Sequence, residues 1–433
     1  MGILHARIED RRACVAVVGM GYVGLPLAHA VHEAGFHVVG IDHDSDRVRA
    51  LQAGESYLGT ASDPIFKLFA SSDRFSASMS EEGIGQCDVV LMCVPTPLGE
   101  NREPDLSYVK SAARMIADSM RAGTLVSLES TTWPGTTRKV VQPILEESGR
   151  IVGEDCFLAY SPERENPGDA TWQAASIPKL VGGVNDQSRD LAAAFYAAVV
   201  EHVVVVSSTE VAEAAKITEN VYRCVNIALV NELKLAYEQM GIDIWEVIEA
   251  SATKPFGFEP FWPGPGLGGH CIPVDPFYLA WRARQSGGAT RFIELAGEIN
   301  TAMPEVVAKR VVTELELEGA NPEGASVLLI GVAYKPNVSD MRETPAAPIF
   351  SGLKQCGCDV FYHDPHCSTF SLGDDLHTSV PLDIERVHNS DVVVIITDHD
   401  EVDWQMIARE ADLIIDCRNV MQGLDVAGRL VKA

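Results

Sequence analysis

Residues 14–24 read Cys14-Val15-Ala16-Val17-Val18-Gly19-Met20-Gly21-Tyr22-Val23-Gly24, an apolar strand that runs directly into three glycines. A helix-like stretch follows from Leu25. Glycines at this spacing permit a tight turn, the close approach of a pyrophosphate and close helix packing, while the helix N-terminus offers unpaired amides to phosphate. The stretch therefore predicts a dinucleotide-binding α/β fold, although the same pattern alone also occurs as a simple glycine turn.

A second strand strengthens this prediction. It spans Phe36 to Ile41 and ends in Asp42, eighteen residues after Gly24. A carboxylate there accepts hydrogen bonds from the ribose hydroxyls of adenosine, which favours NAD over NADP. The residues predicted to bind the cofactor are Gly19, Gly21, Tyr22, Val23, Gly24, Asp42, Arg47, Pro95, Thr96 and Thr131.

Three later strands of the first domain also end in polar loops. The strands span residues 88–94, 124–128 and 156–160, and the loops after them carry Thr96, Thr131 and the pair Glu163-Arg164. Loops that leave the carboxyl ends of parallel strands line the ligand crevice. Either threonine is equally suited to cap the next helix, and the charged pair is equally suited to a surface turn.

A long helix is predicted over residues 210–240, which contain neither glycine nor proline. Lys216, Asn220 and Arg223 fall at i, i+4 and i+7, so they share one face and can point together into a cleft. The alternative is an ordinary solvated stripe. A helix this long between domains also suits a homo-oligomer interface, in a dimer or a larger assembly.

A glycine-rich loop, residues 264–276, follows a shorter predicted helix and carries Cys271 and Asp275. A thiol can attack a carbonyl carbon and a carboxylate can move protons, so the loop suits covalent catalysis. An inert, buried cysteine in a tight turn is the alternative. A further helical stretch is expected from Arg291 to Thr301, just before Pro304.

The last third repeats the alternation of strand and helix seen in the first. Its first strand, residues 327–332, leads into a loop with Lys335 and Arg342 instead of three glycines, and such cations suit a phosphate-bearing ligand. The fold class is therefore α/β, with two Rossmann-like doubly wound domains joined by a long central helix. We expect domains at residues 1–208, 209–310 and 311–433. The Cys and His spacings match no standard zinc pattern, so no metal is expected.

Composition narrows the possible functions. The formal net charge of −27 argues against a broad nucleic-acid surface. No apolar run approaches a membrane span of about 18 residues. The ten cysteines are irregularly spaced and the N-terminus lacks an apolar signal segment, so we expect a reducing, cytoplasmic location and no membrane partner.

Together these elements predict a dehydrogenase whose substrate carries phosphate. A thiol is of no use in simple alcohol oxidation, but it becomes useful when an aldehyde is oxidised further, because the thiohemiacetal can lose hydride and become a thioester. The chain resembles the nucleotide-sugar 6-dehydrogenase family, which includes UDP-glucose and UDP-N-acetylhexosamine dehydrogenases. The resemblance covers nearly the whole chain and rests on Gly19-x-Gly21-x-x-Gly24, Val94-Pro95-Thr96-Pro97, Glu129-Ser130-Thr131, Ser161-Pro162-Glu163, Lys216 with Asn220, the loop with Cys271 and Asp275, and Asp340-Met341-Arg342-Glu343.

The resemblance implies a four-electron oxidation of a sugar C6 alcohol to the carboxylate, with two NAD per sugar, for surface polysaccharide synthesis. Cys271 would be the nucleophile, Lys216 and Asn220 would stabilise oxyanions, Asp275 would assist proton transfer, and Glu163 and Thr131 would hold water or the cofactor. The residues expected to bind the UDP-sugar are Glu163, Arg164, Lys216, Asn220, Arg223, Gly266, Gly268, Gly269, His270, Lys335 and Arg342.

The sequence of the glycine-rich loop resembles that of the N-acetylhexosamine branch of the family. UDP-N-acetylglucosamine is therefore the expected substrate. In the UDP-glucose branch a Phe usually follows the Ser-Pro-Glu and a small residue precedes the cysteine, whereas Arg164 and His270 stand here. UDP-N-acetylmannosamine and UDP-glucose are the alternatives. A 3-hydroxyacid or 6-phosphogluconate-type dehydrogenase, releasing one NADH per substrate, and a non-catalytic nucleotide-sugar sensor are the rival classes.

Overall fold

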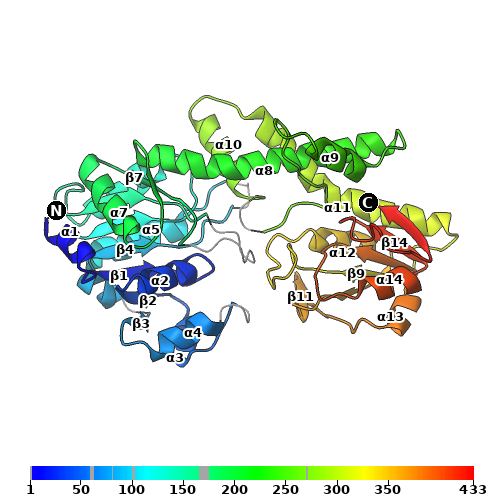
Figure 1. The fold of residues 1–433 in the computed structure, drawn as a ribbon, viewed down its shortest axis with the longest axis horizontal. Helices are drawn as coiled ribbons and strands as arrows, with labels where there is room; N and C mark the ends of the chain where they lie inside the picture. Colours follow the sequence, from blue (N-terminus) through cyan, green and yellow to red (C-terminus); the bar gives the residue numbers. More distant parts are fainter. Residues whose placement is uncertain (1, 59–62, 80, 100–102, 165–174, 270–271) are drawn as a thin grey trace. The chain divides into compact units, whose positions relative to one another are not determined.

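The computed structural model describes residues 2–58, 63–79, 81–99, 103–164, 175–269 and 272–433. The chain divides into two compact units, Met1–Glu219 with Phe277–Ala289, and Asn220–Pro276 with Thr290–Ala433. Each unit is built around its own sheet (Figure 1). Cys271 and His270 lie outside the described residues.

The first unit contains a sheet of eight strands. Its strands are β1 (Cys14–Val18), β2 (His37–Ile41), β3 (Phe75–Ser78), β4 (Val89–Met92), β5 (Leu125–Leu128), β6 (Phe157–Tyr160), β7 (Lys179–Gly183) and β8 (Val203–Val205). They lie in the order β3-β2-β1-β4-β5-β6-β7-β8, whose first six strands follow the order of a dinucleotide-binding sheet. All neighbouring pairs are parallel except β6 with β7.

Helices connect these strands. They are α1 (Gly2–Glu9), α2 (Gly24–Glu33), α3 (Ser45–Ala53), α4 (Asp63–Ser71), α5 (Ser107–Ser119), α6 (Gln142–Glu146) and α7 (Asp186–Ala197), with a 3₁₀ turn η2 (Glu81–Gln86) and a π-helical turn η3 (Thr137–Val141). Strands β4, β5 and β6 are buried along their whole length, as expected for parallel strands covered on both faces. Fully burying each Val, Leu or Phe there contributes about 1.5–3 kcal/mol. Packing of β4, β5 and β6 in the core therefore fixes where these strands end and their loops begin.

The second unit contains a parallel sheet of five strands in the order β10-β9-β13-β14-β15 and a two-stranded hairpin. The strands are β9 (Ser326–Ile330), β10 (Asp359–His363), β13 (Val392–Ile395), β14 (Leu413–Asp416) and β15 (Arg429–Lys432), with β11 (Thr369–Leu372) and β12 (Asp375–Thr378) in the hairpin. Its helices are α9 (Ile244–Ala252), α11 (Arg291–Leu317), α12 (Ala346–Gln355), α13 (Ile384–His388) and α14 (Trp404–Glu410).

Two helices belong to both units. Helix α8 (Thr209–Glu238) is the long helix predicted from the sequence, and α10 (Asp275–Gln285) follows the glycine-rich loop. The expectation of two Rossmann-like sheets and a long central helix is confirmed. Strands β4 and β13 occupy equivalent places, each next to the first strand of its own sheet.

One expected boundary was wrong. The helix predicted from Arg291 to end before Pro304 continues as α11 to Leu317, with Pro304 inside it. A proline ring removes one helical hydrogen bond and crowds the preceding turn. Met303, Val307 and Val311 on either side are buried, so tertiary packing keeps the helix continuous.

Candidate active site

The glycines of the turn between β1 and α2 differ in whether the backbone leaves room for a side chain. Gly19 has φ of +93°, and a Cβ on Gly24 would lie 1.8 Å from the Gly19 carbonyl oxygen. These two glycines are therefore required by the fold. Around Gly21 the nearest atom to an added Cβ is the Arg47 Nη1, 3.9 Å away. The space beside Gly21 is open at the start of α2, which is where a pyrophosphate meets the helix N-terminus.

This difference yields a testable prediction. We expect Gly24→Ala to destabilise the first unit, since the methyl group would overlap backbone. Gly21→Ala should leave the melting temperature unchanged and weaken NAD binding by about 10-fold or more, because its methyl group takes the space of the ligand. Thermal unfolding and calorimetric titration with NAD separate the two effects. Equal NAD affinity for Gly21→Ala and the unaltered protein would contradict this assignment.

Asp42 lies directly after β2 and is buried. Its Oδ2 accepts a hydrogen bond from the Met20 N–H at 2.9 Å, and its Oδ1 accepts one from the Asp44 N–H at 3.0 Å. The Arg47 guanidinium lies 3.4 Å from Oδ2 and over the ring of Tyr57. The carboxylate is thus held at the end of β2, where the ribose hydroxyls of a dinucleotide are recognised.

The predicted residues at the ends of β4 and β5 lie in the same unit. Thr96 is buried, Pro95 is exposed and Thr131 is half-buried. Neighbouring Ser130 donates from its Oγ to the Val94 carbonyl at 2.6 Å, which ties the two strand-end loops together. Tyr22 and Val23, predicted with the glycine turn, differ in burial, since Tyr22 is exposed and Val23 packs half-buried against the core.

A buried ion-pair network lies behind the loop after β6. Lys179 donates to Glu129 Oε2 at 2.7 Å and lies 3.4 Å from Glu163 Oε2. Burial would lower the pKa of Lys179, but the charges of Glu129 and Glu163 outweigh it and raise that pKa, so the amine is protonated. The Tyr196 hydroxyl donates to Glu129 Oε1.

Arg164, predicted to bind substrate, makes its contacts within the first unit. Its guanidinium pairs with Glu219 on α8 at 2.7 Å and donates to the Pro178 carbonyl at 2.7 Å. Glu163 accepts the Arg164 N–H on Oε1 at 2.6 Å. Arg164 therefore fastens the loop that carries Glu163.

Helix α8 carries Lys216 and is anchored one turn earlier by Glu213. The Glu213 carboxylate is fully buried and accepts hydrogen bonds from the Gly135 N–H, the Thr137 N–H and the Thr137 hydroxyl at 2.5, 2.8 and 2.7 Å. Lys216 itself is 7% exposed, and no carboxylate among the described residues lies within 4.0 Å of its amine. Glu213 thus fixes the helix segment that holds this buried lysine.

The next turn of α8 carries Asn220, which lies in the second unit. Its Nδ2 donates to Asp275 Oδ2, and its Oδ1 accepts from the Arg223 guanidinium at 2.5 Å. Asn220 and Asp275 are both almost completely buried. The structure therefore brings together three residues that were predicted from α8 and from the glycine-rich loop.

The described part of the glycine-rich loop packs on the loop after β9. Gly268 and Gly269 leave no room for a side chain, because an added Cβ would lie 2.5 and 2.8 Å from the Tyr334 side chain. The Gly269 N–H donates to the Arg342 carbonyl at 2.9 Å. Gly266 similarly packs against Pro304 and Pro345. The loop that leads to Cys271 is therefore in backbone contact with the predicted phosphate-binding loop.

In the predicted phosphate-binding loop, Arg342 is half-exposed and forms a two-pronged ion pair with Asp340, with its Nη2 at 2.6 Å from Oδ2. Lys335 is half-buried. The loop is shaped by Asp364, which accepts the Val332 and Ala333 N–H groups and pairs with buried His399 at 3.1 Å. Burial would raise the pKa of Asp364, but His399 and these N–H groups lower it to about 2.

Sequence reasoning missed Lys179, Tyr196 and the role of Glu129. Lys179 reads as the first residue of an apolar strand, Lys-Leu-Val-Gly-Gly, where a charged residue is unusual at a buried position. This charged residue in an apolar strand was the only sign in the sequence that Lys179 has a special role. The partners are distant in sequence, so their contacts follow from the fold alone.

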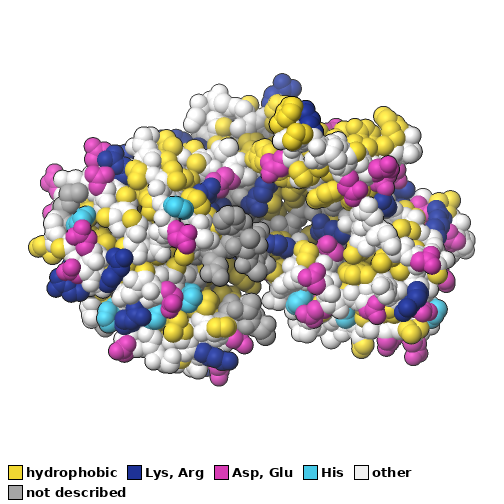
Figure 2. Space-filling model, viewed as in Figure 1, with side chains coloured by type: hydrophobic (Ala, Val, Ile, Leu, Met, Phe, Trp, Pro, Cys, Tyr) yellow, Lys and Arg dark blue, Asp and Glu magenta, His cyan; other side chains and the backbone are white. Residues whose placement is uncertain are grey.

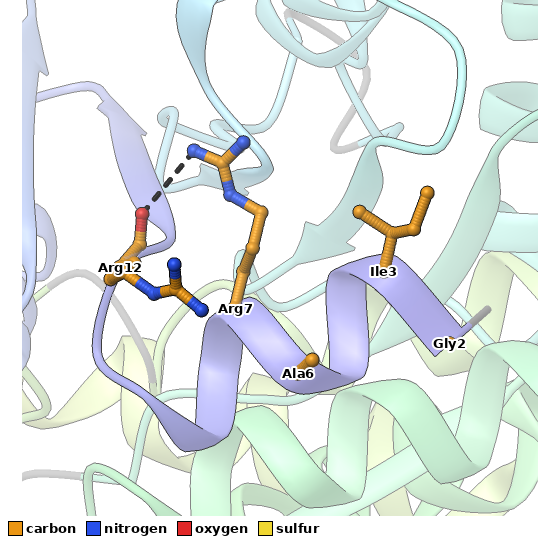
Figure 3. Close-up of a pocket in the computed structure, with 5 residues that line it drawn as sticks. All are labelled: Gly2, Ile3, Ala6, Arg7 and Arg12. Carbon is orange, nitrogen blue, oxygen red and sulfur yellow. Dashed lines mark hydrogen bonds between the residues drawn. The ribbon is translucent and has the colours of Figure 1, made fainter.

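Two cavities of about 570 Å³ lie away from these residues. One runs beside α1 and is lined by Gly2, Ile3, Ala6, Arg7 and Arg12, with the Arg7 guanidinium donating to the Arg12 carbonyl (Figure 3). The other lies between α8 and α9 in the second unit and is largely apolar. Neither is lined by a predicted site residue.

Three models of the UDP-glucose/GDP-mannose dehydrogenase family match the chain, the NAD binding domain at residues 13–200, the central domain at 210–302 and the UDP binding domain at 328–423. The chain belongs to this family. As a UDP-glucose/GDP-mannose dehydrogenase family member it is an NAD-dependent UDP-sugar dehydrogenase, which confirms the predicted activity class and cofactor.

Named relatives cover most of the chain. The UDP-N-acetyl-D-glucosamine 6-dehydrogenase of Pseudomonas aeruginosa is 37% identical over 82% of this chain and 83% of its own. The UDP-N-acetyl-D-mannosamine dehydrogenase of Pyrococcus horikoshii is 33% identical over 94% of this chain and 96% of its own. A solved structure of the UDP-D-ManNAc dehydrogenase from Pyrococcus horikoshii superposes with a TM-score of 0.88 at 32% identity, covering 96% of this chain and 98% of that chain.

The glycine turn fits the NAD that the family uses. Space beside Gly21, a helix N-terminus and the oriented Asp42 carboxylate are the three features that a dinucleotide needs. Within the described ranges, no group of three or more His, Cys, Asp or Glu side chains is arranged to hold a metal. The described helices include none that is long and apolar enough to span a membrane.

Proposed function

We propose that the protein oxidises the C6 alcohol of a UDP-N-acetylhexosamine to the carboxylate, with two NAD per sugar, through a covalent intermediate on Cys271. The observation that carries this proposal is Lys216, a buried amine with no carboxylate partner among the described residues, in a protein of net charge −27. A buried cation without a counter-ion suits the stabilisation of an oxyanion that forms during reaction.

The roles follow from the chemistry of each side chain. Lys216 and Asn220 stabilise the oxygen of the alcohol and then of the covalent intermediates. Cys271 adds to the C6 aldehyde, giving a thiohemiacetal that is oxidised to a thioester. Asp275 moves protons, while Glu163 and Thr131 hold the water or the cofactor. NAD, held at the glycine turn and Asp42, would supply the hydride acceptor for each oxidation.

The nucleotide end of the substrate is proposed to lie at the loop after β9. Lys335 and Arg342 supply cations for the diphosphate, and Arg223 and the backbone of Gly266, Gly268 and Gly269 complete the sugar side. Arg342 pairs with Asp340 in this structure, so binding a phosphate there means exchanging one anion for another. His270 is assigned to the sugar from its position in the sequence only.

UDP-N-acetylglucosamine is the proposed substrate, and UDP-N-acetylmannosamine is the second candidate. The relative with 37% identity is a UDP-N-acetyl-D-glucosamine 6-dehydrogenase, which supports the first. Several relatives at 30–33% identity are UDP-N-acetyl-D-mannosamine dehydrogenases, which supports the second. The product would feed surface polysaccharide synthesis.

The test is to incubate the protein with NAD and each UDP-hexose or UDP-N-acetylhexosamine in turn and to count NADH per sugar. A ratio near two with UDP-N-acetylglucosamine is the expected result. A ratio near one would contradict the four-electron reaction, and turnover confined to UDP-glucose would contradict the N-acetylhexosamine assignment. No NADH with any UDP-sugar would point to a non-catalytic binding protein.

We also propose that the protein is a homo-oligomer that associates through α8 and α9. Hydrophobic side chains gather over α9 (Figure 2), and the apolar cavity there is lined in part by half-exposed Leu229 and Phe258. An exposed apolar surface of this kind often marks an interface. Sedimentation velocity at micromolar concentration should give at least twice the mass of 46.8 kDa, and a monomer would contradict the proposal.

A further inference from the structure

The network behind the loop after β6 links the core to Glu163. Tyr196 and Ser127 donate to Glu129 Oε1, Glu129 Oε2 accepts from Lys179, and Lys179 contacts Glu163. The exposed fractions of the Glu129, Lys179 and Glu163 side chains are 0%, 6% and 14%, so exposure grows toward Glu163. The network therefore begins in the interior and ends at Glu163, one of the two carboxylates that the proposed function uses.

Sheet register explains why these residues meet. Strands β6 and β7 are antiparallel, with Ala159 opposite Gly183 and Tyr160 opposite Gly182. Continued for three more residues, the same register places Glu163 opposite Lys179. Strand β5 lies parallel to β6 on its other side, so Glu129, the residue after β5, reaches the same edge. The single antiparallel pairing in an otherwise parallel sheet is what brings Lys179 to the ligand edge.

Lys179 holds the loop at more than one point. Its amine lies 3.3 Å from the Pro162 carbonyl and 3.4 Å from Glu163 Oε2, while the Arg164 N–H donates to Oε1 of the same carboxylate at 2.6 Å. Both oxygens of Glu163 are thus directed by the protein. Glu129 Oε1, by contrast, is occupied by two hydroxyl donors in the interior. Glu129 therefore holds Lys179, and Lys179 orients Glu163.

We propose that Lys179 is a positioning residue for hydrolysis of the covalent intermediate, acting through the Glu163 carboxylate. This inference rests on the proposed function. In that step the water oxygen bonds to the thioester carbonyl carbon, one water proton passes to Asp275, and the C–S bond breaks with its electron pair leaving on the Cys271 thiolate. Glu163 holds the attacking water, so its orientation matters for hydrolysis more than for either hydride transfer.

The test is rapid mixing of Lys179→Met with NAD and the UDP-sugar. We expect a burst of two NADH per site at an unchanged rate, followed by a steady-state rate lower on the order of 10- to 100-fold, as expected when a reacting group is misplaced. Intact-protein mass spectrometry should then show the sugar bound covalently to the enzyme. Lys179→Arg, which keeps the cation, should recover part of the steady-state rate.

Matched variants separate positioning from folding. Lys309→Met removes an exposed lysine of α11 and should leave both phases unchanged. Glu163→Gln should reproduce the slow steady state, and adding Lys179→Met to it should slow hydrolysis little further, because the two act through one group. The double variant Glu129→Gln with Lys179→Met removes both buried charges together, so it tests the proposal even if Lys179→Met alone fails to fold.

The outcomes are distinct. Equal slowing of burst and steady state in a folded Lys179 variant, or no covalent enzyme, would overturn the positioning role while leaving the proposed function intact. An unaltered protein that makes no NADH with any UDP-sugar would overturn the proposed function itself.

Discussion

Cys271→Ser should retain NAD binding and lose acid formation by on the order of 10³-fold or more, a loss typical of removing a catalytic nucleophile. The hydroxyl of serine is a far weaker nucleophile than a thiolate at neutral pH, so the C6 aldehyde is not captured for the second oxidation. At most one NADH per sugar is expected. The measurement is NADH and uronic acid per sugar, with NAD affinity determined in parallel.

The matched control makes the same chemical change elsewhere. Cys356 is an exposed free cysteine after α12, and Cys356→Ser should leave the yield of acid unchanged. Near-normal acid formation by Cys271→Ser would show that the covalent mechanism is wrong, because no other step in the proposed reaction requires sulfur.

Lys216→Met should slow the first hydride transfer itself by about 10²- to 10³-fold, the range found when one oxyanion donor is removed. The long apolar side chain fills the same space, and the lysine has no ion-pair partner among the described residues, so no buried carboxylate is left behind. Stability should therefore be little changed. The measurement is the rate of the first NADH in a single turnover, with thermal unfolding as the check on folding.

Lys67→Met on α4 is the control, because Lys67 is exposed and far from every predicted site residue in the sequence. The two main variants should differ in kind, with Lys216→Met slow in the first oxidation and Cys271→Ser blocked after it. If the Lys216→Met variant forms the first NADH at the usual rate, Lys216 is not a catalytic residue.

The sequence predicted the fold to the extent that hydrophobic runs and glycines determine it. Strands β1 and β2 lie within a residue of their predicted bounds, since each is a short apolar run closed by a glycine or an aspartate. Helix α11 was predicted too short because Pro304 is a strong local stop signal, whereas burial of its neighbours is a tertiary effect.

Site residues were predicted only where a single segment of the sequence contains a recognisable motif. Gly21, Asp42, Asn220 and Asp275 were predicted from local motifs. Lys179 was not, because its role depends on the antiparallel register of β6 and β7 and on a partner fifty residues away. Arg342 was identified, but its pairing with Asp340, two residues earlier, depends on side-chain conformation.

The hydrogen bond from the Gly269 N–H to the Arg342 carbonyl has a kinetic consequence. The segment leading to Cys271, the proposed nucleophile, and the loop proposed to hold the diphosphate share this backbone hydrogen bond, so we expect the UDP group to contribute to turnover and not only to affinity. Remote binding energy used in this way appears in kcat. A sugar without its nucleotide should therefore be a slow substrate even at saturating concentration. The diphosphate would then act mainly by raising kcat.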